Sequence, residues 1–107
     1  MTNLKQITVA GQNIELSEIE KTMQILNAIK HDFRIKIINI LHEENKQNVT
    51  QLFVKLRVEQ SVVSQHLAIL RNAELVISKR EGNNIFYSVN YSRIESIFYL
   101  IQKVNAK

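Results

Sequence analysis

Residues 48–73 read NVTQLFVKLRVEQSVVSQHLAILRNA, and two apolar stripes of helical period flank a short turn within this stretch. The apolar positions are Val49, Leu52, Phe53 and Leu56 in the first half, and Val62, Val63, Leu67 and Leu70 in the second. Spacings of three and four residues are typical of a helix with one face pressed on a core. The stretch therefore predicts two short helices joined by a tight turn.

The other face of the second predicted helix carries short side chains that form hydrogen bonds instead of long charged ones. These residues are Gln60, Ser61, Ser64, Gln65 and His66. Hydroxyls and amides donate and accept, so they suit the mixed donor and acceptor edges of base pairs in a major groove. The alternative is the ordinary solvated face of an amphipathic helix, and the downstream sequence favours the first interpretation.

The downstream segment, LVISKREGNNIFYSVN at residues 75–90, is typical of a β-hairpin. Its runs Val76–Arg80 and Asn84–Val89 are rich in β-branched and aromatic residues, and the Gly-Asn-Asn between them tolerates positive φ. A helix-turn-helix followed by a hairpin is a winged helix. The wing residues expected to contact phosphates or the neighbouring minor groove are Lys79, Arg80, Asn83 and Asn84. The alternative for such cations is a solvated edge that discourages strand pairing.

Two longer segments resemble the ArsR-type bacterial winged-helix regulators. They are ILNAIKHDFRIKIINIL at residues 25–41 and SVVSQHLAILRNAELVISKREGNNIFYSV at residues 61–89. The most specific parts are the pattern SxVSxHLxxLxxAxLV and the wing motif Arg-Glu-Gly followed by an aromatic pair, here Phe86 and Tyr87. The resemblance covers the chain from about Leu16 onward. It implies a mainly α fold with a small β-hairpin, a DNA-binding function, and a first helix that helps to build a dimer interface.

Composition bounds the class of protein. The chain has 107 residues, enough for one small domain, and a formal net charge of +4 that is compatible with nucleic acid. It has no cysteine, which excludes disulfides, thiolate metal sites and thiol redox switches. No apolar run approaches the length of a bilayer and no charged-then-apolar leader opens the sequence, so we expect a cytoplasmic protein that contacts no membrane.

The two ends of the expected domain, residues 16–107, are more apolar than a small core requires. The first helix is expected to begin at Leu16 or Ser17, where Ser17 with Glu20 forms a capping-box pattern. Residues 91–104 predict a strongly amphipathic last helix. A stripe like that of the first helix is most often plain core, but two such exposed stripes favour a two-fold dimer. The expected interface residues are Leu16, Ile19, Met23, Leu26, Ile94, Ile97, Phe98 and Ile101.

Residues 1–15 have weak periodicity around Gly11-Gln12-Asn13. They are compatible with a small hairpin or with an arm that is partly ordered by docking, and we favour the N-terminal arm. Downstream, Asp32 is expected to cap the second helix, where the family resembled here usually has proline. His31 and His42 lack neighbouring ligands, so we expect structural or solvated roles for both.

Metal sensing and catalysis are not expected. In the family resembled here, one metal site would fall around residues 45–52, which hold neither Cys nor His, and another on the last helix, which offers one carboxylate, Glu95, and no histidine. No cofactor is therefore expected. Ser64 and His66 cannot form a catalytic pair, because residues two apart on a helix point about 200° apart.

We predict a homodimeric winged-helix transcriptional regulator that represses by binding an imperfect palindrome of double-stranded DNA, with half-sites about 10 base pairs apart. The alternative is a protein-interaction module without DNA binding, in which the charges of Lys79 and Arg80 would not matter. A small organic ligand or an anion is an open possibility as effector, although no residue marks its pocket. Glu59, before Gln60, departs from the family pattern of a capping serine. It acts either on the helix dipole or by repelling phosphate.

Overall fold

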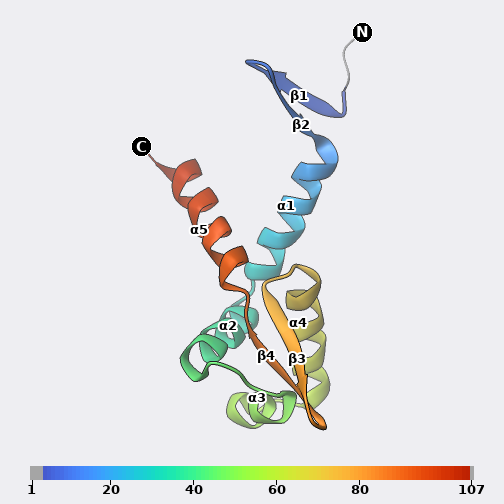
Figure 1. The fold of residues 1–107 in the computed structure, drawn as a ribbon, viewed down its shortest axis with the longest axis vertical. Helices are drawn as coiled ribbons and strands as arrows, with labels where there is room; N and C mark the ends of the chain where they lie inside the picture. The colour runs from blue at the N-terminus through green and yellow to red at the C-terminus, as the bar shows by residue number, and fades with distance from the viewer. Residues whose placement is uncertain (1–3, 107) are drawn as a thin grey trace.

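The computed structural model describes residues 4–106, and Figure 1 shows five helices and two antiparallel hairpins. In chain order the elements are β1 (Gln6–Val9), β2 (Gln12–Glu15), α1 (Leu16–Ile29), α2 (Asp32–Glu44), α3 (Val49–Leu56), α4 (Gln60–Asn72), β3 (Val76–Glu81), β4 (Asn84–Val89) and α5 (Tyr91–Asn105). The helix-turn-helix of α3 and α4 is followed by the β3–β4 hairpin, which confirms the predicted winged helix.

The core lies where α2, α3 and α4 meet the base of the wing. Its buried side chains are Ala28, Ile37, Leu41, Leu52, Val63, Leu67, Leu70, Leu75, Val76, Val89 and Ile97. The apolar stripes predicted on α3 and α4 supply four of these residues, so the periodicity identified the correct faces. Among residues 4–106 no buried side-chain nitrogen or oxygen lacks a hydrogen-bond partner.

The wing is a regular two-stranded ribbon tied to the rest of the domain at its base. Its register runs from Val76 opposite Val89 to Glu81 opposite Asn84, so β3 is one residue longer than predicted and the loop is Gly82-Asn83. Gly82 has φ +63°, a conformation that glycine adopts without strain. The backbone of Gln47 exchanges hydrogen bonds of 3.1 and 2.8 Å with Tyr87, which fixes the wing to the loop between α2 and α3.

Two predicted helix caps are wrong, although α1 begins at Leu16, one of the two starts expected from the sequence. Helix α1 begins at Leu16 directly after β2, and the Leu16 amide donates to the carbonyl of Lys5, so Ser17 lies inside the helix and forms no capping box. Helix α2 is capped by His31 and not by Asp32, because the His31 Nδ1 accepts a hydrogen bond of 3.2 Å from the Phe33 amide. Asp32 instead occupies the first turn, where its charge favours the helix dipole.

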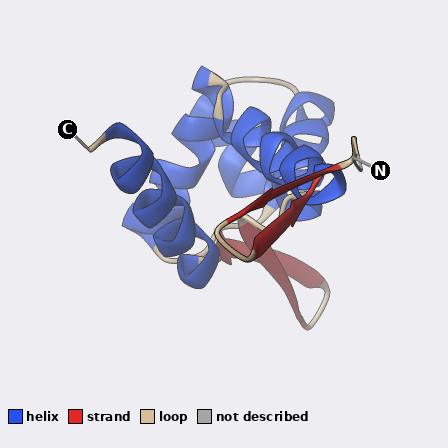
Figure 2. Cartoon of the chain, turned by 90° about the horizontal axis from the view of Figure 1, so that it is seen from above, coloured by secondary structure: helices blue, strands red, loops and turns tan. Residues whose placement is uncertain are grey.

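Residues 6–15 form a hairpin and not the loose arm that we favoured. The turn is at Ala10-Gly11, one residue earlier than the Gly-Gln-Asn run suggested, and both turn residues have positive φ, of 54° and 78°. Two successive residues with positive φ form the type of turn whose twist matches that of paired strands. Figure 2, viewed down the long axis, shows this hairpin in front of the wing.

The molecule is extended for its size. Helices α1 and α5 diverge from the winged-helix body as the two limbs of a V (Figure 1). The radius of gyration is 17.0 Å, whereas a compact chain of this length has about 13 Å. The accessible surface is 8243 Å², whereas a compact monomer of this mass exposes about 6,200 Å². No helix among residues 4–106 is long and apolar enough to cross a membrane.

Candidate nucleic-acid interface

Helix α3 is anchored by a capping box that the sequence analysis missed. The Asn48 Oδ1 accepts from the Gln51 amide at 2.8 Å, and the Gln51 Oε1 accepts from the Asn48 amide at 2.9 Å. The spacing Asn-x-x-Gln ahead of an apolar run is a readable signal of such a box. This reciprocal pair fixes the start of the helix-turn-helix.

The turn between α3 and α4 is made by a residue in an unusual conformation. Arg57 has φ 56° and ψ 45°, the left-handed region that glycine usually occupies. The next amide, of Val58, returns to the Phe53 carbonyl at 3.3 Å and closes the turn. This conformation leaves the Arg57 side chain exposed at the helix-turn-helix corner, a cation that the sequence pattern did not single out.

Helix α4 presents the predicted polar side chains to solvent. Gln60, Ser61, Ser64 and Gln65 are all exposed, whereas Val63 and Leu67 on the opposite side are buried. In Figure 1 the start of α4, helix α3 and the tip of the wing lie together at the end of the molecule away from the chain termini. The exposed part of α4 and the wing therefore form one continuous edge.

His66 differs from its four neighbours because it is half-buried against α2. Its ring lies 4.9 Å from that of His31 and 4.7 Å from that of Phe33. Arg34 Nη1 is 3.2 Å from His66 Nδ1, and because a guanidinium only donates, Nδ1 is the acceptor and the second ring nitrogen carries the proton. Arg34 also donates to the last carbonyls of α1, at 2.6 Å to Ala28 and 3.3 Å to Asn27.

The surroundings of His66 depress its pKa. Burial contributes most, followed by the charges of His31 and Arg34. Because the pKa of His66 in the folded state lies below the ordinary value, the neutral ring contributes to the free energy of unfolding at neutral pH. This contribution is lost as pH falls below about 6.5.

We expect the free energy of unfolding, measured by urea denaturation, to fall more between pH 7.5 and 5.5 in the wild type than in His66→Gln. Glutamine keeps an acceptor for Arg34 but does not titrate. Equal losses in the two proteins would show that protonation of His66 is not responsible.

The wing exposes Lys79, Arg80, Asn83 and Asn84, as a backbone-binding role requires. Arg80 folds around the tip, where its Nε donates to the Gly82 carbonyl at 3.3 Å. Lys79 and Arg80 lie in β3, Asn83 in the loop and Asn84 at the start of β4, so all four lie at or near the tip of the wing.

The acid at the wing tip is neutralised from outside the wing. Lys46 Nζ lies 2.6 Å from the Glu81 carboxylate and 4.7 Å from the centroid of the Phe86 ring. The hydrogen bond from Lys46, together with the charges of Lys46 and Lys79, lowers the pKa of Glu81 despite some opposing desolvation. Lys46 thus cancels a charge that would repel phosphate.

Glu59 occupies the N-cap of α4 but its side chain forms no cap hydrogen bond. We expect Glu59→Ser to raise the free energy of unfolding by about 0.5–1 kcal/mol, because serine satisfies an amide of the first turn. It should also tighten binding to all DNA sequences, because it removes a negative charge. Denaturant melts and DNA titrations measure the two effects.

Glu59→Gln separates the two roles. It removes the charge without adding a good cap, so only DNA binding should improve. Weaker DNA binding by Glu59→Gln would instead indicate that the carboxylate accepts a hydrogen bond from a base.

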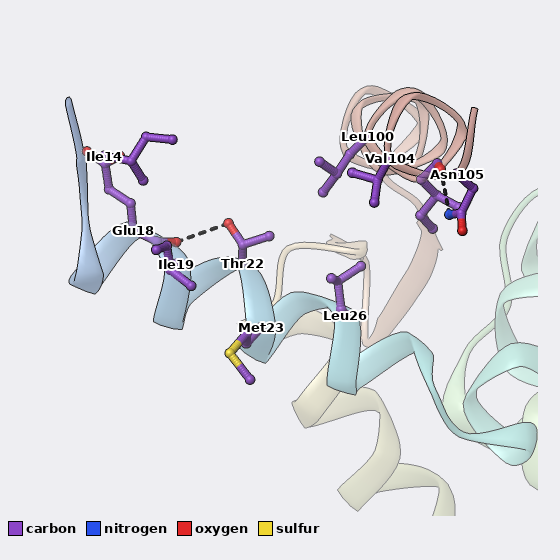
Figure 3. Close-up of a pocket in the computed structure, with 10 residues that line it drawn as sticks. Ile14, Glu18, Ile19, Thr22, Met23, Leu26, Leu100, Val104 and Asn105 are labelled. Carbon is purple, nitrogen blue, oxygen red and sulfur yellow. Dashed lines mark hydrogen bonds between the residues drawn. The ribbon is translucent and has the colours of Figure 1, made fainter. Parts of the chain in front are cut away.

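The terminal helices carry an exposed apolar groove. Met23 is 56% exposed and Phe98 59%, and Leu16 and Ile101 are also exposed. Between the two helices lies a groove of about 550 Å³. Figure 3 shows Leu26 on one side of it and Leu100 and Val104 on the other, pointing toward one another.

The other expected interface residues are less exposed. Ile19, Leu26 and Ile94 are half-buried, and the last two pack on the core. Ile97 is 5% exposed and belongs to the core of a single chain, so it has little surface to offer a partner.

The histidines outside α4 have neighbours of their own. His31 caps α2, and the His42 Nδ1 lies 2.8 Å from the Tyr91 hydroxyl. Over residues 4–106 no three His, Asp or Glu side chains cluster closely enough to hold a metal ion.

Comparisons with known proteins point to one family. A family model described as bacterial regulatory protein, arsR family, matches residues 32–78. The transcriptional repressor PagR of Bacillus anthracis is 35% identical over 91 residues, which are 85% of this chain and 91% of PagR. The transcriptional activator HlyU of Vibrio cholerae is 30% identical over 98 residues, which are 88% of this chain and 90% of HlyU.

Solved structures agree with the sequence comparisons. The crystal structure of PagR has a TM-score of 0.66 at 36% identity, covering 81% of this chain and 99% of PagR. NolR from Sinorhizobium fredii has a TM-score of 0.68 at 29% identity, covering 84% of this chain and 89% of NolR.

Proposed function

Because this chain belongs to the ArsR family of bacterial regulatory proteins, and is thus a DNA-binding transcriptional regulator and not an enzyme, we propose that it is a homodimeric repressor. Its α4 would enter the major groove and its wing would follow the adjacent backbone or minor groove. PagR, named as a repressor, supports repression.

One observation carries this proposal. The start of α4 lies at the same end of the molecule as the wing tip (Figure 1). This part of α4 carries the exposed polar side chains, and the opposite side of the helix is buried in the core. A rigid helix holds its donors and acceptors at fixed positions, which direct readout of base edges requires. The wing adds the cations Lys79 and Arg80, which suit phosphates.

The charge of each side chain indicates which residues of this edge would read bases and which would bind phosphates. Gln60, Ser61, Ser64 and Gln65 are neutral and would read base edges, whereas Arg57, Lys79 and Arg80 are cations and would hold phosphates. The wing amides Asn83 and Asn84 suit either the backbone or the minor groove. His66 has one nitrogen occupied by Arg34, so its remaining N–H would reach a phosphate or a flanking base.

Dimerisation through α1 and α5 would place two copies of α4 on one face of the duplex. Two-fold symmetry in the protein requires an imperfect palindrome in the operator, with half-sites about 10 base pairs apart. The excess of exposed apolar surface on these helices supports such a dimer. The interface we propose uses Leu16, Ile19, Met23, Leu26, Ile94, Phe98 and Ile101, without the buried Ile97.

The test is fluorescence anisotropy of the protein on DNA from upstream of its own gene, with unrelated DNA as control, across a salt series. We expect Gln65→Ala to weaken binding to the specific site roughly 5- to 150-fold and to leave unrelated DNA nearly unaffected, because it removes base contacts. Arg80→Ala should weaken binding to both, because phosphates are the same in every sequence.

Gln24→Ala on α1 is the matched control, since Gln24 is an exposed glutamine away from the proposed interface and should leave binding unchanged. Equal loss on every sequence would exclude base readout by Gln65. No binding to any DNA at low salt would instead favour a protein-interaction module.

A further inference from the structure

The N-terminal hairpin has one apolar and one polar face. Its register pairs Ile7 with Ile14 across the strands, and Val9 lies two residues beyond Ile7 on the same face. The opposite face carries Thr8 and Asn13, whose side chains are hydrogen-bonded to each other. This alternation is typical of a ribbon that covers a hydrophobic surface.

The apolar face of the hairpin is uncovered in the single chain. Ile7 is 53% exposed, Val9 66% and Ile14 46%. The hairpin joins the body at the start of α1, and Figure 1 shows it at the far end of that helix from the core. An isolated two-stranded hairpin is marginally stable in water and needs another surface to pack on.

The position of Ile14 indicates which surface this is. Ile14 lines the groove between α1 and α5, together with Ile19 and Met23 of α1 and Val104 of α5 (Figure 3). The apolar face of the hairpin is thus continuous with the surface that the proposed dimer would bury. A second copy seated in this groove would meet the hairpin and the terminal helices at once.

We propose that the hairpin is a dimerisation clasp, whose apolar face packs on the terminal helices of a second copy. Two-fold symmetry makes the contact reciprocal, so each dimer has two clasps. The polar pair Thr8 and Asn13 then faces solvent. This inference rests on the homodimer of the proposed function and adds a segment to its interface.

Sedimentation equilibrium of the full chain tests the energetic contribution of the clasp. The double variant Ile7→Ser with Val9→Ser should raise the dimer dissociation constant about 30-fold or more. Each dimer would lose four apolar side chains that the clasp buries in part against the second copy. The matched control, Gln6→Ser with Thr8→Ser, changes the polar face and should leave that constant within about 3-fold of wild type. Equal dissociation constants for the two double variants would overturn the clasp.

Thiol protection gives a second, local readout. Because the chain has no cysteine, Val9→Cys and Thr8→Cys each carry a single thiol. The reaction rate of the Val9→Cys thiol with an aromatic disulfide reagent should fall about 10-fold or more as the protein is concentrated through its dimerisation range. Thr8→Cys should stay reactive throughout. Equal concentration dependence at the two positions would contradict the proposal.

The outcomes separate the clasp from the dimer itself. If the wild type dimerises but the clasp variants have the same dissociation constants and thiol reaction rates as their controls, the clasp is wrong and the homodimer stands. If wild type is monomeric at every concentration, both are wrong. DNA binding by α4 is measured independently through Gln65→Ala.

Discussion

A chain carrying Met23→Glu is expected to be monomeric at concentrations where the wild type is a dimer, and to bind its operator about 100-fold or more weakly. Met23 is 56% exposed and lies beside the groove of α1 and α5. In a two-fold dimer the substitution places two carboxylates in an apolar interface, where unpaired charges are strongly unfavourable. The operator would then be held by one winged helix, without the 10²- to 10⁴-fold avidity of two linked sites.

Sedimentation and DNA titration measure the two parts of this expectation. Gln24→Glu is the control, because it adds the same charge to the next position of α1 but outside that groove. It should preserve the dimer. Dimeric Met23→Glu with full operator affinity would show that α1 does not form the interface.

The substitution Leu67→Ala is expected to lower the free energy of unfolding by about 2–5 kcal/mol. Leu67 is 1% exposed on the buried face of α4, opposite the polar residues that we propose to face DNA. Removing three carbon atoms there leaves a cavity beneath α4, because the surrounding side chains relax only in part. Domains of this size are stable by only about 5–15 kcal/mol, so a large share of the stability would be lost.

Urea denaturation followed by circular dichroism measures this loss. Ile69→Ala on the same helix is the control, because Ile69 is 43% exposed and its truncation leaves little cavity. We expect it to lose less than about 1 kcal/mol. Similar losses for the two variants would show that α4 is not anchored through Leu67.

Periodicity predicted the parts of this fold that are decided by burial. The stripes of α3 and α4 gave the correct inward faces, because their spacing arises from the same burial that stabilises each helix. The wing followed from β-branched residues on both sides of a Gly-Asn turn, although most of β3 is exposed. The resemblance added the family, which the comparisons confirm.

Sequence rules for helix caps and buried faces failed where a residue that is a neighbour in space determined the structure. The Ser17 box did not form because β2 runs straight into α1, and Asp32 did not cap α2 because His31, held against His66, took that position. Ile97 was assigned to the outer stripe, yet it is 5% exposed and belongs to the core of a single chain. Periodicity gives the direction in which a side chain points, but not which other part of the chain it meets there.

The exposure of the candidate residues on α4 could be predicted from the sequence, but the contacts that support the candidate interface could not. The four exposed polar positions of α4 follow from the helical period once its buried face is known. Lys46 and Arg57 could not be found in this way, because one acts through a salt bridge 35 residues away in sequence and the other through a left-handed turn that arginine rarely adopts.

The contacts of Arg34 join the end of α1 to α4 mechanically. One guanidinium holds the last carbonyls of α1 and the ring of His66 on α4. A ligand that repositioned the end of α1 would therefore also shift an anchor of α4, without touching DNA. Thermodynamic linkage makes such an effect reciprocal, so DNA would change the affinity for that ligand by the same factor.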